Sequence, residues 1–320
     1  MTGLLDSDGA LHALAPEWEA LWGQVPGASP FSHPGWLLPW WREFGTGMPR
    51  VAVLRDGGAL AGVLPLYLLD GYGPRQMLPI GVSLSDATGA LLRPGVPPGP
   101  LLAAALARAD GANTCTIADV PAGSTLVDAP APPGWRREAS AGAACPALAL
   151  SGPLDAIAPK GMLRKLRMNR NRAERAGGAA VEAGLLADVQ RLHQSRWEAD
   201  GQPGVFADGA AARFLCAAAP ALEQAGLLRL RSLRVGGEVA ASCCALLQDG
   251  RILFYLQGFD AAHATCSPGS LLVAAMLQEA IAEGRHEADF LRGQEAYKYA
   301  WGAVDRRLVS LRFVRDGAGW

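Results

Sequence analysis

A short segment near the end of the chain, Asp289–Gly302, concentrates side chains that can move protons. It reads DFLRGQEAYKYAWG and begins in a predicted strand at 287–291. Tyr297 and Lys298 can donate a proton or stabilise an oxyanion, and Asp289 or Glu295 can orient them or act as the base. These four residues are therefore candidate catalytic groups.

The same segment contains two candidate substrate contacts, Arg292 and Trp301. A solvated loop whose aromatic residues plug the sheet is the alternative explanation. Polar segments at strand ends often hold functional groups. Charged and aromatic residues crowd around Gly293, and this density favours a functional site over a plain loop.

A second candidate site lies where a predicted strand at 252–257 leads through a loop into a predicted helix at 268–283. Ser267 suits the N-cap, and Pro268 suits the first helical position. Gly269 and Ser270 keep the first turn small, so its backbone N–H groups stay accessible to an anion such as a pyrophosphate. Taken alone, the local pattern is explained more simply by an ordinary capped helix.

A third candidate is the pair His193 and Trp197, which lie four residues apart on one face of a predicted helix. His193 can act as a base or contact an acceptor. A half-buried histidine packed near a tryptophan explains the pair at least as well. The other histidines and the six cysteines show no metal-ligand spacing, so we expect no metal site.

Residues 160–175 predict a strongly basic helix. Its cations are Lys160, Arg164, Lys165, Arg167, Arg170, Arg172 and Arg175. A solvated helical face explains them, and binding of phosphate groups on a donor or acceptor is the alternative. No aromatic residues are interleaved, so the stacking pattern typical of single-stranded nucleic-acid binding is missing.

The elements that must position these groups occur twice. Residues 50–71 and 229–250 align without a gap and are identical at nine of 22 positions. Each copy holds a Gly-Gly turn between two apolar runs, which predicts a β-hairpin. Segments 98–105 and 268–275 repeat the similarity in the same order. We expect an α+β fold of two domains, 1–155 and 156–320, each a mostly antiparallel twisted sheet flanked by helices.

Composition excludes several classes of protein. The chain has 320 residues, half of them apolar, and a formal charge of −1, so it exerts no general attraction on nucleic acid. The N-terminus lacks the basic and apolar regions of a signal peptide. Charges at Arg55 and Asp56 interrupt the apolar run 51–69 and exclude a membrane helix there. With cysteines typical of reduced, buried thiols, these features predict a cytoplasmic protein without a membrane span.

Short motifs that span most of the chain resemble a known family. They are Trp18, Ser29-Pro30-Phe31, Trp36, Trp40, Trp41, Leu192-His193, Arg196-Trp197, Phe206, the hairpin 226–250, Gly258-Phe259-Asp260, Ser267-Pro268-Gly269, Asp289–Gly293, Tyr297-Lys298 and Trp301-Gly302. Together they resemble the GNAT acyltransferase superfamily in its tandem-domain branch. More narrowly, they are similar to the CelD/BcsL-like acetyltransferases of cellulose biosynthesis, which are relatives of the Fem-type peptidyltransferases.

The resemblance implies two GNAT folds and transfer of an acyl group from a thioester, acyl-CoA in the first instance, to an amine on a small molecule, glycan or peptide. It implies a cleft in the second half, with the first half shaping the acceptor site. Tyr297 would protonate the leaving thiolate, and Lys298, fixed by Asp289, would stabilise the anion or hold the acceptor. The donor-binding candidates are Gln257, Gly258, Ser267, Gly269, Ser270 and Leu271.

The chain departs from the family pattern in two places. The Gly-rich RxxGxG/A loop is replaced by the sequence ATCSPG at 264–269, and Gln294 stands where an acid usually follows Gly293. Two alternatives therefore stay open. One is a Fem-type transferase that uses aminoacyl-tRNA, and the other is a non-catalytic GNAT-fold binding module in exopolysaccharide assembly.

Overall fold

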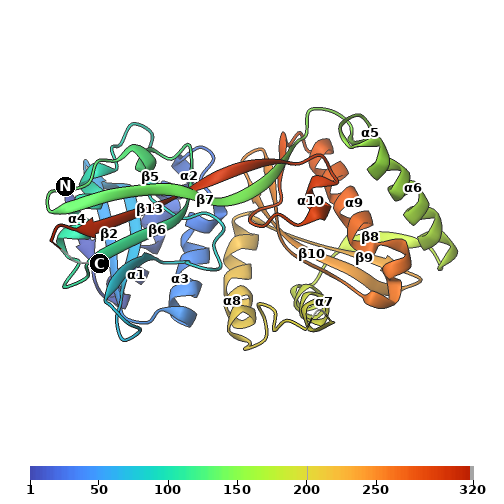
Figure 1. The fold of residues 1–320 in the computed structure, drawn as a ribbon, viewed down its shortest axis with the longest axis horizontal. Coiled ribbons are helices and arrows are strands. Elements are labelled where there is room, and N and C mark those ends of the chain that lie inside the picture. Colours follow the sequence, from blue (N-terminus) through green and yellow to red (C-terminus); the bar gives the residue numbers. More distant parts are fainter. Residues whose placement is uncertain (200, 318–320) are drawn as a thin grey trace. The chain divides into compact units, whose positions relative to one another are not determined.

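The computed structural model describes residues 1–199 and 201–317, and the chain divides into two compact units (Figure 1). Unit 1 comprises Met1–Ala143 and the segment that begins at Arg307, and unit 2 comprises Ala144–Arg306. The division falls within a long strand, β7 (Trp135–Ala149), and not near residue 155. The Ala- and Gly-rich sequence of β7 has low strand propensity, which is why this strand was not predicted.

Unit 1 is a mixed sheet covered by helices. Its strands lie in the order β1-β2-β3-β4-β6-β13, and β5 pairs with β3. The strands are β1 (Thr2–Leu5), β2 (Met48–Asp56), β3 (Ala59–Leu69), β4 (Gln76–Pro79), β5 (Leu91–Leu92), β6 (Thr114–Pro121) and β13 (Val304–Arg315). The helices are α1 (Asp8–Ala13), α2 (Ala15–Gln24), α3 (Pro34–Phe44) and α4 (Gly99–Ala107).

Tryptophans anchor the helices of unit 1, as their helical spacing predicts. Trp18 and Trp36 are fully buried. The Trp18 indole donates to the Ser32 carbonyl at 3.1 Å, and the Trp36 indole donates to Ser85 Oγ at 2.9 Å. Each ring therefore fills the core while its N–H group keeps a partner.

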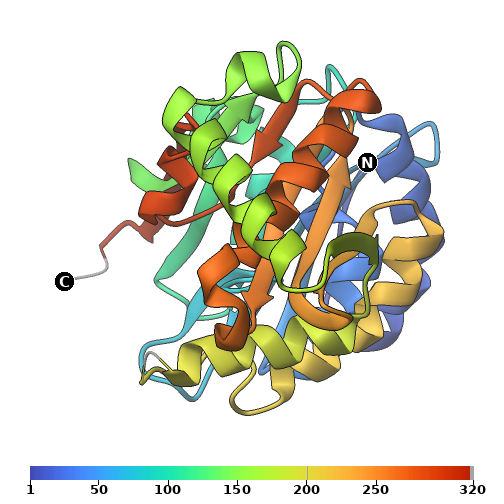
Figure 2. The ribbon, with the colours of Figure 1, turned by 90° about the vertical axis from the view of Figure 1, so that its right-hand side faces the viewer.

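Unit 2 contains the remaining strands of the sheet, with helices on both faces (Figure 2). Its path runs β7-β12-β11-β10-β9-β8. The remaining strands are β8 (Ala179–Ala183), β9 (Leu228–Val235), β10 (Glu238–Gln248), β11 (Arg251–Phe259) and β12 (Glu287–Asp289). The helices are α5 (Leu154–Ile157), α6 (Lys160–Arg175), α7 (Leu186–Ala199), α8 (Ala210–Gln224), α9 (Pro268–Ala282) and α10 (Ala296–Tyr299). Among the described residues, no helix has the length and apolarity needed to cross a bilayer.

The repeat seen in the sequence is a repeat in structure. The β2–β3 and β9–β10 hairpins turn through two glycines each, both with positive φ, which only glycine adopts without strain. These φ angles are 58° and 87° at Gly57 and Gly58, and 59° and 89° at Gly236 and Gly237. In both hairpins the register shifts by one residue at the same aligned position, Ala61 in one and Ala240 in the other.

Strands β11 and β12 separate soon after they meet. Their parallel pairing covers only Arg251–Leu253 on β11. A bulge follows at Tyr255, because Cys244 and Ala245 of β10 pair with Leu256 and Phe254. Strand β11 continues to Phe259, whereas β12 ends at Asp289. The edge of β11 beyond the bulge is therefore not paired with β12, and a wedge opens between the two strands.

Helix α7 lies directly against the far end of β11. A Cβ atom at Gly258 would lie 2.3 Å from the backbone N of His193 and 2.3 Å from the backbone C of Leu192. Neither backbone atom can move without moving the helix. Glycine at this position therefore sets the distance between α7 and the sheet.

Replacing Gly258 by alanine should lower the free energy of unfolding by about 1–3 kcal/mol, because the new methyl group overlaps the α7 backbone. Urea denaturation monitored by circular dichroism measures the change. Gly161→Ala is the matched control, since Gly161 has open space around its Cβ position. An unfolding midpoint for Gly258→Ala equal to that of the control would contradict the close packing.

Candidate functional site

A pocket of about 290 Å³ lies along the end of β11, beyond the point where its pairing with β12 stops. Its wall comes from α7, β10, β11, the start of α9, α10, and Trp301, which lies just after α10. The lining residues are Arg196, Ser242, Gln257, Gly258, Phe259, Ala264, Ser267, Gly269, Ser270, Leu272, Val273, Tyr297 and Trp301.

The pocket brings together seven of the fourteen residues predicted from the sequence. These are Gln257, Gly258, Ser267, Gly269, Ser270, Tyr297 and Trp301. The residues that do not line it are Lys298, Asp289, Glu295, Leu271, His193, Trp197 and Arg292. The two candidate segments therefore meet in space, although about 30 residues of sequence separate them.

The first turn of α9 presents an uncapped N-terminus to the pocket. Ser267 occupies the N-cap as predicted, but its side chain makes no capping hydrogen bond, and its backbone lies in the left-handed region (φ 45°, ψ 61°). The structure gives the Gly269 N–H group no partner within 1–199 and 201–317. A free N–H group at the positive end of a helix dipole is suited to an anion.

Tyr297 lies on an aromatic stack that holds its ring in the pocket wall. Its ring meets Phe290 edge to face at 6.3 Å, and Phe290 stacks on Phe254 at 5.2 Å. Burial raises the pKa of Tyr297 above its usual value, and the Glu295 carboxylate adds to this shift. A hydrogen bond with the Gln257 side chain opposes it only in part. The phenol therefore keeps its proton at neutral pH and can donate it.

Lys298 is buried and does not reach the pocket, so its ammonium group is not available to an oxyanion or an acceptor. Only 2% of the residue is exposed. Its Nζ donates to the carbonyls of Arg292 (2.7 Å), Gly293 (3.2 Å) and Leu291 (3.3 Å) and lies 2.9 Å from a Glu295 carboxylate oxygen. The lysine therefore fixes the loop that leads into α10 and Tyr297.

Asp289 stabilises the same loop from its other end. Its Oδ1 accepts a hydrogen bond from the Leu291 N–H at 2.8 Å, and its Oδ2 lies 2.5 Å from Arg306. Leu291 has a positive φ of 58°, a conformation that costs a non-glycine residue energy. Burial raises the pKa of the Asp289 carboxyl, and Arg306 opposes this shift. Asp289 and Lys298 thus act on Tyr297 through the backbone.

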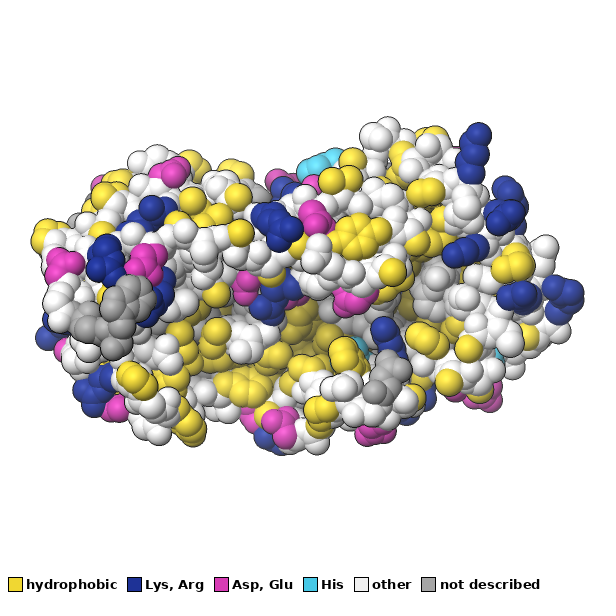
Figure 3. Space-filling view, viewed as in Figure 1, with side chains coloured by type: hydrophobic (Ala, Val, Ile, Leu, Met, Phe, Trp, Pro, Cys, Tyr) yellow, Lys and Arg dark blue, Asp and Glu magenta, His cyan; other side chains and the backbone are white. Residues whose placement is uncertain are grey.

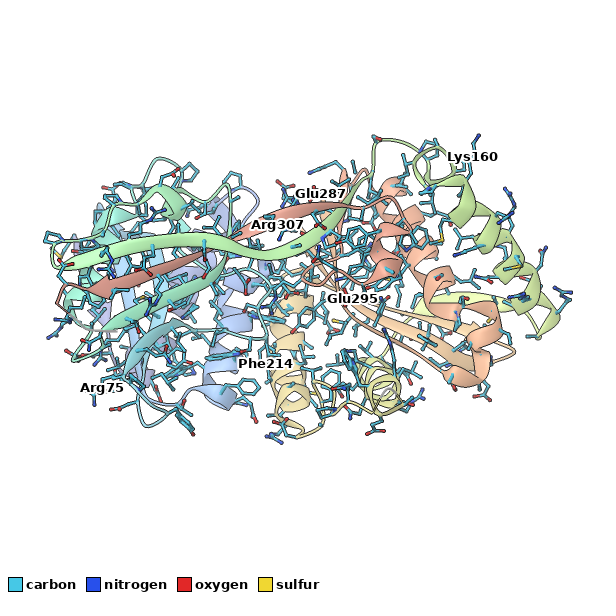
Figure 4. The ribbon with its side chains drawn as sticks, in the orientation of Figure 1. Arg75, Lys160, Phe214, Glu287, Glu295 and Arg307 are labelled. Carbon is cyan, nitrogen blue, oxygen red and sulfur yellow. The ribbon has the colours of Figure 1, made fainter. Side chains whose placement is uncertain are left out.

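Glu295 is the most exposed of the four predicted catalytic groups (Figure 4). About half of its side chain is accessible, and its carboxylate pairs with Lys298. It therefore neutralises the buried lysine and does not face the pocket. The Arg292 side chain also lies outside the lining, although its carbonyl is the closest acceptor of the Lys298 ammonium group.

His193 lies behind the pocket wall as a neutral ring. The Trp197 indole donates to His193 Nε2 at 3.1 Å, so Nδ1 carries the ring proton, and Nδ1 has no partner in the described part of the chain. Burial, together with the charge of Arg196, lowers the pKa of His193 to about 4. So low a pKa makes His193 a weak base, and the half-buried packing explanation fits it.

Arg196 is a pocket residue that was not among the predicted site residues. Its guanidinium lies 6.0 Å from the centre of the Phe259 ring, and no ion pair engages it among the residues the structure describes. Phe259 in turn lies 3.8 Å from the Cβ position of Gly269. The sequence placed Arg196 beside His193 and Trp197, but only the packing of α7 shows which of these side chains faces the pocket.

Ser242 was also not predicted. It lies on β10, where its Oγ is 3.0 Å from Ser232 Oγ. Both serines are buried, and a serine in a buried strand gives no sequence signal of a pocket. Its position beside Gly258 in the sheet register brings it to the wall.

The lining favours direct transfer over a covalent intermediate on the protein. None of the lining side chains is a carboxylate, an imidazole or a thiol. Cys243 pairs with Gln257 in the sheet, but burial raises the pKa of its thiol well above the usual value, so it carries no thiolate. Cys216 is exposed, unlike the buried thiol expected there. The groups that remain are the Tyr297 phenol, the Arg196 guanidinium, the Gln257 amide, three serine hydroxyls and the first turn of α9, and the lining has no imidazole or carboxylate to activate a serine.

The equivalent position in unit 1 is built differently. Strand β3 pairs with β4 and, after an intervening loop, with β5. A Cβ atom at Gly62 of β3 would lie 2.8 Å from a Leu92 methyl carbon and 2.9 Å from a Leu101 methyl carbon. Helix α4 starts between Pro98 and Pro100, which have no N–H to offer. Leu92 and Leu101 therefore pack closely against β3 at this glycine.

Comparison with known proteins agrees with this geometry. The family model described as an acetyltransferase (GNAT) domain matches residues 160–299, from α6 through α10. Residues 160–299 are therefore similar to a GNAT acetyltransferase domain, and this segment contains most of the pocket. No curated protein matches the chain in sequence.

Solved structures share the fold along the whole chain. FemX aligns with a TM-score of 0.69 at 12% identity, covering 97% of this chain and 96% of its own. L-PGS from Bacillus licheniformis aligns with 0.58 at 14% identity, covering 98% and 93%. A tandem GNAT protein from the clavulanic acid biosynthesis pathway aligns with 0.50 at 16% identity, covering all of both chains. The fold is therefore the predicted α+β type, with a large sheet flanked by helices.

The low pKa of His193 predicts acid destabilisation. The unfolded chain binds a proton near the ordinary histidine pKa of about 6.5, whereas the folded chain does so only near pH 4. The unfolded state therefore gains protons first as pH falls, and stability drops by on the order of 3 kcal/mol between these two values.

Urea denaturation across this pH range checks the prediction. In His193→Gln the free energy of unfolding should change less steeply with pH. The remaining slope comes from the smaller contribution of His33, because burial also lowers the pKa of His33. Exposed His12→Gln is the control and should keep the full slope. An unchanged slope in His193→Gln would show that the ring is not held neutral.

Proposed function

We propose that this chain is an N-acyltransferase that moves an acyl group from a pantetheine-type thioester, acyl-CoA in the first instance, to an amine acceptor. One observation carries the proposal. A single pocket joins the uncapped first turn of α9 to the protonated phenol of Tyr297 along the unpaired edge of β11.

The residues present fit such a donor. The Gly269 N–H group and the α9 dipole offer a place for a phosphate of the donor, and Arg196 adds a positive charge nearby. Leu272, Val273 and Trp301 give the pocket an apolar wall for the arm and the acyl group. Acyl-CoA, when bound, supplies a thioester carbonyl that an amine can attack.

The reaction forms a C–N bond and breaks a C–S bond. The acceptor must first lose a proton from its ammonium form, because only the neutral amine attacks. After attack the nitrogen gives up a second proton, and the departing sulfur takes one. Tyr297 is placed to give that proton to the sulfur because its phenol is protonated at neutral pH, and the phenolate then regains a proton from water.

The lining holds no carboxylate or imidazole that could deprotonate the acceptor. Water is therefore the proton acceptor in this proposal. Asp289, Glu295 and Lys298 act as positioning residues, since their contacts hold the loop that carries Tyr297. Unit 1, whose helix α4 starts between two prolines without N–H groups, shapes the acceptor site in this proposal and runs no reaction of its own.

Isothermal titration with acetyl-CoA and with one long-chain acyl-CoA tests the donor. Gly269→Leu fills the first turn of α9 and should raise the Kd of the wild-type protein by at least about tenfold. Gly161→Leu is the matched control, because Gly161 is likewise the second residue of its helix, and it should leave Kd within about twofold. No binding of either donor to the wild type would refute an acyl-CoA donor and favour a tRNA donor or a non-catalytic module.

Tyr297→Phe should lower kcat by about 10²–10⁴-fold with little change in the donor Kd, because only the proton donor is removed. The pH profile gives a second readout. Because no protein base assists, kcat/KM of the wild type should rise about tenfold per pH unit up to the pKa of the acceptor amine. Unchanged turnover in folded Tyr297→Phe would exclude this residue as the acid, and a plateau below pH 7 would reveal a base on the protein.

A further inference from the structure

Helix α6 carries a basic surface that the proposed reaction does not use. We call it the α6 face, and it consists of Lys160, Arg164, Lys165, Arg167, Arg170, Arg172 and Arg175, all of which are exposed. The opposite side of the helix, with Met162 and Leu166, is buried in the core of unit 2. Figure 3 shows the cations gathered along this edge of unit 2, and Figure 4 labels Lys160 at its start.

The cations of the α6 face have no carboxylate partners among the residues the structure describes. Elsewhere the chain pairs its arginines, since at least thirteen of them lie within 4 Å of an Asp or Glu oxygen. With a formal charge of −1 overall, the chain has enough acids to neutralise this helix too. The positive charge is therefore concentrated on one helix.

This concentration is unfavourable for the helix itself. Arg164 lies four residues after Lys160 and three before Arg167, so like charges are neighbours on one side of the helix. The first turn has a lysine and no acid, against the direction of the helix dipole. A merely solvated surface would not need such an arrangement, whereas an anionic partner would offset its cost.

The Arg172 end of the α6 face lies beside the wall of the pocket. Helix α6 packs against α9 and against the short helix Ala261–Cys266 that precedes it. Arg172 Nη1 donates to the Thr265 carbonyl at 2.9 Å. The neighbouring Ala264 lines the pocket, and Ser267 begins α9. A partner bound to the α6 face at its Arg172 end therefore lies beside Ala264 and Ser267 of the pocket wall.

The size of the α6 face fits a macromolecule. From Lys160 to Arg175 the helix rises by about 22 Å, at about 1.5 Å per residue. A single coenzyme A carries only a few phosphates and cannot meet all seven cations. The face has no aromatic residues on which nucleic-acid bases could stack. An acidic protein surface matches a long, convex row of arginines and lysines best.

We propose that the α6 face docks an acidic carrier protein that presents the acyl thioester on a phosphopantetheine arm. This inference rests on the proposed acyl transfer and names the form of the donor. The arm enters between Ala264 and Ser267, and the same bonds change as before. The C–S bond breaks, the C–N bond to the amine forms, and the protonated thiol stays on the arm of the carrier.

The test compares one acyl group on two donors, an acidic acyl carrier protein and coenzyme A. In R164E/R167E, kcat/KM with the carrier should fall at least about tenfold, whereas kcat/KM with acyl-CoA should stay within about twofold. The control R42E/R108E makes the same change in net charge at exposed positions of unit 1 and should leave both values unchanged. A carrier in which two surface acids are replaced by lysine should restore transfer by R164E/R167E.

Other outcomes overturn the inference. Equal losses with both donors would assign the α6 face to the phosphates of coenzyme A or to stability. An unchanged kcat/KM of R164E/R167E with the carrier would show that the α6 face does not dock the carrier. Binding of wild-type protein to tRNA or to anionic phosphatidylglycerol vesicles, abolished in R164E/R167E while the carrier does not bind, would assign it to nucleic acid or membrane.

Failure of the proposed reaction can be told apart from failure of docking. If neither donor supports transfer, binding of a fluorescently labelled apo-carrier still reports on the surface alone. Wild-type protein should bind it with an affinity that falls as salt rises, and R164E/R167E should bind at least about tenfold more weakly. Equal binding by the two proteins would exclude the docking surface whatever the reaction is.

Discussion

The separation of β11 from β12 is the constraint on which the site depends. The two strands pair over three residues, and the bulge at Tyr255 then turns β11 away while β12 stops. Everything that lines the pocket takes its place from this wedge. Gly258 lets α7 press against the free end of β11, and the chain then turns back at Ser267 so that α9 points its N-terminus into the opening. A sheet paired along its full length would have closed the site.

The charged residues nearest the chemistry serve mainly to hold backbone. Lys298, Asp289 and Glu295 use their charges on one another, on Arg306 and on loop carbonyls. Such buried charges are costly unless fully paired, and here each has its partners. Their combined effect is to keep Leu291 in an unfavourable conformation and to seat Tyr297 against Phe290. Tyr297 is thus a neutral group positioned by a charged scaffold.

The two units show how one architecture supports a site in one copy and a plain core in the other. Their hairpins share the glycine turn and the bulge at Ala61 and Ala240. The difference begins after the hairpin. In unit 1 Leu92 and Leu101 pack closely against Gly62 of β3, and prolines remove N–H groups from the start of α4. In unit 2 Gly269 and Ser270 keep the first turn of α9 small beside the pocket.

The sequence by itself determined the local features of this protein. Two-glycine turns, the Ser-Pro start of α9 and the apolar stripe of α6 each follow from the conformational limits of a few neighbouring residues, so the repeat, the α+β fold and the bounds of α6 could be read directly. The tertiary structure alone decided which side chains meet. Arg196 enters the pocket and Lys298 leaves it because helix packing and long-range strand pairing, which no local pattern encodes, set the direction of each side chain. The low-propensity strand β7 forms for the same reason, since its neighbours in the sheet come from distant parts of the chain.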